Sequence, residues 1–259
     1  MAKKVKKNLP AKKGTSVALY DVDDEDIGAG TENVTKDFLL IPLLNVLQTN
    51  SPQVDEDDAS HIDGCEVGDI LNGAIQATYP GDEGITVVVV WLSRVFIEWV
   101  PRDSGGGFVA SHSPADIEVT YDKIPFGVIE TEDGNEIVET FQMFCILLSQ
   151  DGTMDRVVIP FKSTQIKVFK SMATVINKVV QLQDGRYVQP PAYARKYKLR
   201  TKPDENKKGK FRSWAWSYEG GSEEKSILKK DSAIWNEAKS FYQSCKKGEV
   251  RADMAQDRN

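Results

Sequence analysis

The chain has 259 residues, of which 40% are hydrophobic and 28% charged, as expected for a soluble globular protein that buries its own core. No run of about 18 apolar residues occurs, and the basic N-terminal residues are not followed by the apolar stretch of a secretory signal, so we expect neither a membrane span nor a signal peptide. The 3 cysteines form no CxxC pair and only 2 histidines are present, which argues against disulfides, a cysteine zinc site and histidine-based catalysis.

The formal net charge of −6 conceals a segregated distribution of charge. Residues 1–13 carry six lysines and no acid, whereas residues 21–26 carry five acids and residues 55–58 carry four. Residues 193–218 carry nine bases and two acids. Because a polyanion responds to local charge, the segment 193–218 is the candidate for binding one.

The N-terminal third of the chain predicts an arm followed by strands. Residues 1–34 are polar and divided into a basic and an acidic block, so we expect a mostly disordered arm. Residues 38–48 are strongly apolar but contain Pro42, which favours an edge strand over a helix. Residues 85–101 are rich in Val, Ile, Trp and Phe and predict a strand too long to stay straight, as in a curled sheet or barrel.

The rest of the chain alternates unevenly between strands and helices. Residues 136–150 and 155–162 predict a hairpin turning at Asp151-Gly152. Apolar residues at helical spacing predict one helix after Ser163 or Thr164 and a second from Ser222 to Lys247. Strands in runs, without regular β-α alternation, indicate a mainly β (α+β) fold, for which we expect an OB-like antiparallel barrel with two added helices.

We expect three regions along the chain. The disordered arm covers residues 1–34, and an OB-like nucleic-acid-binding domain covers residues 35–221. Residues 222–259 form an amphipathic helix that packs on this domain, followed by a short tail.

Residues 194–202 and 210–218 predict a second hairpin, in which cations and rings each recur on alternate residues. The cations are Lys196, Lys198, Arg200 and Lys202 on the first strand and Lys210 and Arg212 on the second, and the rings are Trp214, Trp216 and Tyr218. If even-numbered residues pair with even-numbered ones, cations and rings share a surface that suits unpaired nucleic acid, with cations on phosphates and rings on bases. If even pairs with odd, the tryptophans join Tyr197 and Leu199 in the core and the lysines are an ordinary solvated face. We favour the shared surface, because salt-bridged surfaces usually mix the two signs of charge.

Other candidate sites are weaker. Trp99, near Arg94, Arg102 and a flexible glycine loop at 105–107, is a candidate second stacking platform. The loop lacks the Lys-Ser or Lys-Thr of a phosphate cradle, and the acidic run 55–58 is better explained as a solvated loop than as a Mg²⁺ site. His61, Asp63 and Cys65 lack the fourth ligand of a zinc site. With no usable Ser-His-Asp or Cys-His set either, we expect no enzyme, metal or cofactor.

Five spaced segments within residues 38–218 carry a family resemblance: IPLLNVLQTNSPQV, GDILNG, FIEWVPRDSGGGFVAS, FKSTQIKVFKSM and PPAYARKYKLRT. This pattern resembles early proteins of tailed bacteriophages that are described as single-stranded DNA-binding proteins with an OB-like barrel. The resemblance implies a non-catalytic role in phage DNA replication or recombination in the host cytoplasm. Its implied partners are single-stranded DNA and phage replication or recombination proteins. One departure is the C-terminal segment KKGEVRADMAQDRN, which lacks the acidic tail that recruits partners in many such proteins.

The sequence therefore predicts sequence-tolerant binding of single-stranded DNA. The alternative is a phage structural or assembly protein, in which the same basic surface meets the acidic face of another protein. The oligomeric state does not follow from the sequence.

Overall fold

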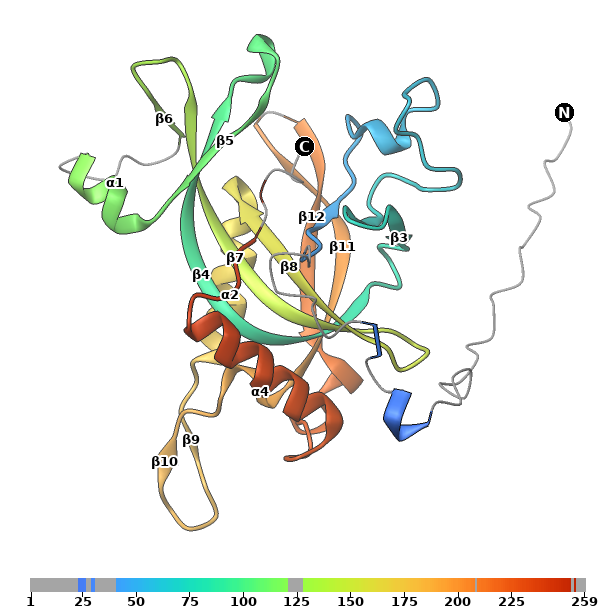
Figure 1. The fold of residues 1–259 in the computed structure, drawn as a ribbon, viewed down its shortest axis with the longest axis vertical. Coiled ribbons are helices and arrows are strands. Elements are labelled where there is room, and N and C mark those ends of the chain that lie inside the picture. The colour runs from blue at the N-terminus through green and yellow to red at the C-terminus, as the bar shows by residue number, and fades with distance from the viewer. Residues whose placement is uncertain are drawn as a thin grey trace, which may run out of the picture.

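The computed structural model describes residues 23–26, 29–30, 41–120, 128–207, 209–252 and 254. The disorder predicted for residues 1–34 falls almost wholly outside these residues. The described part is mainly β and antiparallel, as expected, and is built on one seven-stranded sheet (Figure 1). Its central order is β12-β11-β4-β7-β6, with β5 paired to β4 and β8 paired to β7. The strands are β4 (Ile85–Val100), β5 (Gly107–His112), β6 (Val128–Glu130), β7 (Glu136–Leu148), β8 (Met154–Lys162), β11 (Lys196–Asn206) and β12 (Gly209–Tyr218).

Smaller elements surround this sheet. The short strands are β1 (Leu44–Val46), β2 (Ile70–Asn72) and β3 (Ala77–Tyr79), which form a second antiparallel sheet, and β9 (Val180–Gln181) and β10 (Tyr187–Val188), which form a hairpin. The helices are α1 (Pro114–Thr120), α2 (Ile166–Ile176), α3 (Glu223–Ser226) and α4 (Ala233–Lys246). The described residues thus contain four α-helices, whereas the sequence predicted two.

The long strand β4 bends, as its length predicted. Its pairing with β7 shifts by one residue between Val89 and Trp91, which is a β-bulge. A bulge bends a strand and increases its twist. Figure 1 shows the result, with β4 and β7 curving together through the molecule.

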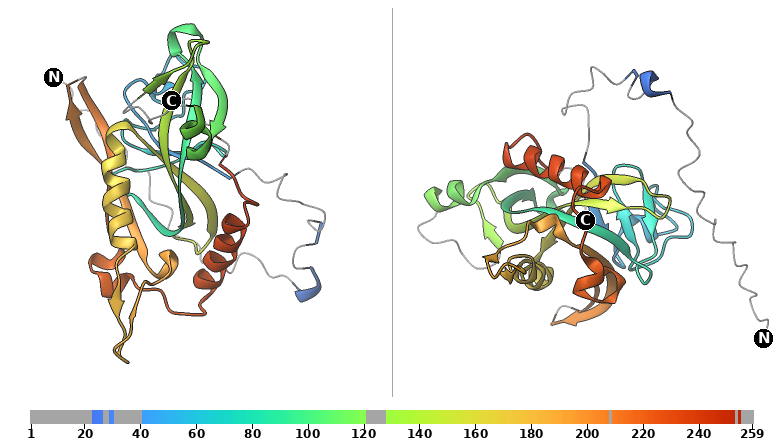
Figure 2. Two further views of the ribbon diagram at one scale, coloured as in Figure 1. Left: turned by 90° about the vertical axis from the view of Figure 1, so that its left-hand side faces the viewer. Right: turned by 90° about the horizontal axis from the view of Figure 1, so that it is seen from below.

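The curled sheet carries a hydrophobic core on each face. On one face α2 and the small sheet enclose residues such as Val87, Phe161 and Phe169. On the other face α4 packs through Phe241 against residues such as Val88. Figure 2 (left) shows α2 and α4 on opposite sides of the sheet. Helix α4 therefore covers one face of the sheet.

The predicted OB-like barrel is not confirmed, because the described strands do not close into a continuous ring. Strand β1 reaches the edge of β8 through a single parallel bridge between Leu43 and Val158. Just after β1, a side chain bonds to β12: Gln48 Nε2 donates to the carbonyl oxygen of Arg212 at 3.0 Å, and Gln48 Oε1 accepts from the Arg212 N–H at 2.8 Å. These contacts hold the two edges of the curled sheet together without a strand ladder.

The predicted C-terminal helix is interrupted between α3 and α4. Ser222 caps α3 and Ser232 caps α4, each through its side-chain oxygen. Between them, Leu228 N–H donates to the carbonyl oxygen of Ala194 at 2.9 Å, so the chain leaves the helix to bind the β domain. The buried guanidinium of Arg195 fixes the same region through an ion pair with Glu223 at 2.8 Å. These tertiary contacts explain why one periodic stretch forms two helices.

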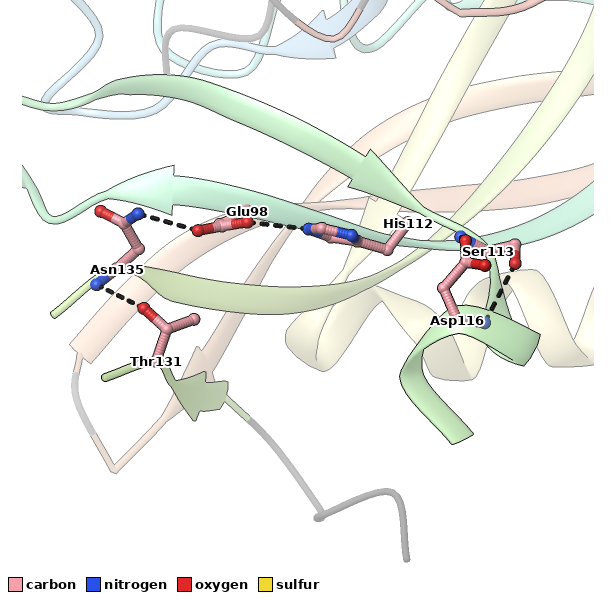
Figure 3. Close-up of polar contacts among 6 residues, drawn as sticks. All are labelled: Glu98, His112, Ser113, Asp116, Thr131 and Asn135. Carbon is pink, nitrogen blue, oxygen red and sulfur yellow. Dashed lines mark hydrogen bonds and ion pairs between the residues drawn. The ribbon is translucent and has the colours of Figure 1, made fainter. Parts of the chain in front are cut away.

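A network of polar side chains ties together the ends of β4, β5 and β7 (Figure 3). Glu98 Oε1 accepts from Asn135 Nδ2 at 2.8 Å, and Glu98 Oε2 lies 2.8 Å from His112 Nε2. Next to His112, Ser113 and Asp116 bond each other's backbone N–H at the start of α1. The hydrogen bonds from Asn135 and then His112 lower the pKa of Glu98 below its usual 4.5.

We expect this network to weaken in acid. A lowered folded-state pKa means that ionised Glu98 stabilises the fold above the ordinary carboxyl pKa, and that the contribution disappears as the pH falls through the folded-state pKa. Glu98→Gln should therefore lower the free energy of unfolding at neutral pH by about 1–2 kcal/mol, with the deficit shrinking below about pH 4. Urea unfolding at several pH values measures this, with the exposed Glu130→Gln as control. A deficit that is the same at every pH would contradict the assignment.

Candidate nucleic-acid interface

The register of the β11–β12 hairpin decides which side chains share a face. Tyr197 pairs with Tyr218, Leu199 with Trp216, and Thr201 with Trp214. Directly opposed residues in an antiparallel pair project from the same face, so odd-numbered residues of β11 lie with even-numbered residues of β12. The expectation that the cations and the rings share one surface is therefore wrong.

The rings of this hairpin belong to the core. Trp214 is 1% exposed, and its ring centroid lies 6.4 Å from that of Phe161. Burial raises the pKa of Tyr197 to about 12, and the partly buried Trp216 and Tyr218 pack around its ring with centroid distances of 6.1 and 5.9 Å. A base could reach Trp214 as a stacking partner only if the core opened. The proposed platform is thus overturned at Trp214, and the partly buried Trp216 and Tyr218 pack against the core on the face opposite the β11 cations.

The cations of β11 point away from that core. Lys196, Lys198, Arg200 and Lys202 alternate with the buried positions, and we call these four residues the outward cation row. Their neighbours on the same face of β12 are Ser213, Ala215 and Ser217.

One acidic group of the same strand face interacts with the outward cation row: Asp204, two residues after Lys202, has its pKa lowered chiefly by a hydrogen bond from Lys167 and in part by the charge of Lys202. Arg200 and Lys202 are exposed, and Lys198 Nζ donates to the carbonyl oxygen of Gly84 at 3.2 Å. Glu219 lies near one end, where its carboxylate accepts from Thr86 Oγ1 at 3.0 Å. None of the four cations forms an ion pair with a residue that the structure describes. The row therefore presents concentrated positive charge without an adjacent ring.

The two cations at the start of β12 have different surroundings. Arg212 lies on the inner side of the hairpin, where its side chain passes directly over Gly68. Lys210 faces a pocket. Neither residue belongs to the outward cation row.

The second predicted stacking platform was centred on Trp99, and the structure places a cation other than Arg94 beside this ring. Trp99 and Arg94 are five residues apart and so project from opposite faces of β4. Arg94 is paired with Glu139 at 2.6 Å and lies over the rings of Phe96 and Phe141. The grouping of Arg94 with Trp99 is wrong for this reason. Arg102 begins a short 3-10 helix, and its side chain is outside the described part of the structure.

Trp99 instead lies beside Phe108 and Lys162. Its ring meets that of Phe108 edge to face, with centroids 5.9 Å apart, and Lys162 Nζ is 5.6 Å from its centroid. Phe108 is 38% exposed. Sequence reasoning missed Lys162, which is 63 positions from Trp99 and reaches it only through the pairing of β8 with β7 and of β7 with β4. No local pattern marks this neighbourhood.

A pocket of about 550 Å³ lies where β1, the β8–α2 connection and the start of β12 meet. Its lining combines two lysines, side-chain amides, hydroxyls and an apolar wall, and among the described lining residues none is acidic. The lining residues are Asn45, Val46, Gln48, Thr49, Asn50, Pro160, Lys162, Ser163, Thr164, Gln165, Lys210, Phe211 and Trp214. The pocket lining therefore includes Lys210 and Trp214, both predicted site residues, together with Lys162.

A family model described as Pam3 phage gp34-like protein matches residues 11–251, almost the whole chain. The chain belongs to this family. The phage origin implied by the segment resemblance is thereby supported. Comparisons with curated proteins and with solved structures gave no match.

Within the described residues, no three His, Cys, Asp or Glu side chains are grouped so as to hold a metal ion. Within the same residues, no helix has the length and apolar character needed to cross a membrane. The candidate site therefore consists of the outward cation row, the Trp99–Phe108–Lys162 group and the pocket.

Proposed function

We propose that this protein binds single-stranded DNA with little preference for base sequence, in phage DNA replication or recombination. The observation that carries the proposal is the outward cation row, whose four positive charges are not ion-paired to described residues. Uncompensated cations on one surface bind phosphates and release counterions. Since phosphates are the same in every sequence, contacts of this kind are tolerant of sequence.

The spacing of the row suits a nucleic-acid backbone. Alternate residues of a strand recur about every 6.6 Å, which is comparable to the distance between neighbouring phosphates of an extended strand. Four successive cations can thus follow four successive phosphates.

Rings for unpaired bases would come from outside the hairpin. Phe108 is partly exposed, Trp99 lies against it, and the Lys162 ammonium group is 5.6 Å from the centroid of the Trp99 ring. Stacking on such rings requires an unpaired base, because the faces of paired bases are occupied inside a duplex. This supports a preference for single strands.

One observation favours the alternative, a phage structural or assembly protein. On its β12 side the outward cation row is flanked by the small side chains of Ser213, Ala215 and Ser217. Such a surface suits the acidic face of a protein as well as it suits phosphates.

A titration separates the two functions. Labelled oligo-dT and a duplex of equal length are titrated by fluorescence anisotropy between about 50 and about 200 mM salt. We expect tighter binding of the single strand than of the duplex. The slope of the logarithm of the binding constant against the logarithm of the salt concentration should be about −2.8 or steeper, that is about −0.7 for each of four phosphates. An absence of binding, or binding that ignores salt, would favour the assembly protein, which should instead self-associate when concentrated.

A further inference from the structure

Helix α4 carries rings and cations in alternation along one flank. Four residues, spaced by four, three and four positions, form what we call the α4 stripe: Trp235, Lys239, Tyr242 and Lys246. Residues three and four positions apart are neighbours on one side of a helix. The two rings are half-buried and the two lysines are exposed. The buried side of the helix is formed by other residues, Ala238, Phe241 and Cys245, so the stripe lies beside the core contact.

The stripe lies on the side of α4 that is nearer to β11. Helix α4 lies across β4 and β7 (Figure 1), where Phe241 packs in one core with Val88 and its ring centroid is 6.3 Å from that of Phe144. On the flank opposite the stripe, Glu237 is paired with Arg156 of β8 at 2.8 Å. Within the sheet, β7 and β4 lie between β8 and β11. Since one flank of α4 points toward β8, the stripe on the other flank points toward β11.

The stripe and the outward cation row also share one face of the sheet. Lys196, the first cation of the row, is directly opposed to Val88, which belongs to the core beneath α4. Directly opposed residues project from the same face. Tyr193, three residues before Lys196, connects the two groups, because its ring centroid lies 5.1 Å from that of Trp235 and 5.9 Å from that of Tyr242.

The polar groups of the stripe are available to a ligand. Neither lysine of the stripe forms an ion pair with a described residue, and the next carboxylate along the chain, Glu249, is paired with Lys247 at 3.8 Å. Among the described residues, Trp235 Nε1 and Tyr242 Oη have no hydrogen-bond partner, and neither atom is buried. Aromatic residues with an apolar body in the core and a polar atom at the surface are enriched at binding interfaces.

We propose that the bound single strand continues from Lys196 onto the α4 stripe, with phosphates on Lys239 and Lys246 and bases against Trp235 and Tyr242. The inference rests on the proposed function, which it makes more specific. Cations that follow the backbone and rings that stack on bases are the two contacts that an unpaired strand requires. The outward cation row supplies the first kind alone, and the stripe supplies both on the same face.

Photocrosslinking locates the bases directly. An oligo-dT carrying one 5-iododeoxyuridine is bound to the wild-type chain and irradiated, and the crosslinked residue is mapped by mass spectrometry. We expect crosslinks at Trp235 or Tyr242. This arm needs no variant, so it decides the matter even if a substitution impairs folding.

Two variants separate the charge of the stripe from its rings. Lys239→Gln/Lys246→Gln should reduce the salt slope of oligo-dT binding by about 1.4, that is about 0.7 for each of two phosphates, and weaken binding about fivefold at low salt. Trp235→Leu should weaken binding about tenfold and leave the salt slope unchanged, because it removes stacking without removing charge. Trp235→Phe keeps a ring and should bind nearly as the wild type does.

The exposed pair Lys229→Gln/Lys230→Gln removes the same charge outside the stripe, and it should keep the wild-type salt slope. If the wild type binds oligo-dT but crosslinks only outside the stripe, or if the two lysine pairs behave alike, the stripe assignment is overturned while the proposed function stands. If the wild type does not bind oligo-dT at all, both fall.

Discussion

Replacing Trp214 by alanine is expected to lower the free energy of unfolding by about 3–5 kcal/mol. The side chain is 1% exposed and packs in the core with Phe161, so its removal deletes buried contacts and leaves a cavity. Because domains of this kind are stable by only about 5–15 kcal/mol, the variant should unfold at a clearly lower urea concentration. Equilibrium urea unfolding followed by circular dichroism measures the change.

Trp99→Ala provides the matched control. Trp99 is only partly buried, so the same truncation should cost less stability there. An unfolding free energy that stays at the wild-type value in Trp214→Ala would contradict the core position of this ring. It would also mean that the Trp214 ring is accessible enough to stack on a base, as the sequence had predicted.

Signals confined to a few neighbouring residues predicted much of the fold. The β-branched and aromatic run of β4, the Asp-Gly turn between β7 and β8 and the periodic apolar residues of α2 all correspond to observed elements. Each depends on the chemistry of adjacent residues, which the sequence displays directly. Their boundaries agree with the expected ranges to within a few residues at most of their ends.

The failed prediction concerned register, which depends on the length of a turn. Pro203 suggested a loop over residues 203–209, but β11 continues to Asn206 and only residues 207 and 208 connect it to β12. Pro203 is tolerated because β4 pairs with β11 only between Lys196 and Leu199, so the missing N–H leaves no gap in a ladder. A change of one residue in register moves every side chain to the other face. The sequence placed these cations and rings on one hairpin, but it could not say which face of the hairpin each of them occupied.

The pocket and the Trp99 neighbourhood depend on contacts between distant segments. The pocket draws on residues 45–50, 160–165 and 210–214, which meet only because the sheet curls. No periodicity or motif in the sequence predicts that these three segments lie side by side. Lys162, the residue common to the pocket and to Trp99, was accordingly beyond local sequence reasoning.

The largest functional effect should come from neutralising the outward cation row. The variant Lys196→Gln/Lys198→Gln/Arg200→Gln/Lys202→Gln should reduce the salt slope of oligo-dT binding by about 2.8, that is about 0.7 for each phosphate released. Exposed ion pairs contribute about 0.2–1 kcal/mol each, so four correspond to a loss of affinity on the order of 50-fold at low salt. Anisotropy titrations at several salt concentrations give both quantities.

A second variant separates the row from charge in general. Lys225, Lys229, Lys230 and Lys247 are exposed, and their replacement by glutamine removes four positive charges without touching β11. Because salt screens exposed charges beyond about 10 Å, the loss of net charge alone should matter little at moderate salt. Equal losses in the two variants would mean that the protein attracts DNA through its overall field, and the row would have no special role. A loss confined to the row variant would mean that phosphates lie along the outward face of β11, opposite the face that carries Trp214 and Trp216, so that any rings that stack on bases lie outside the hairpin.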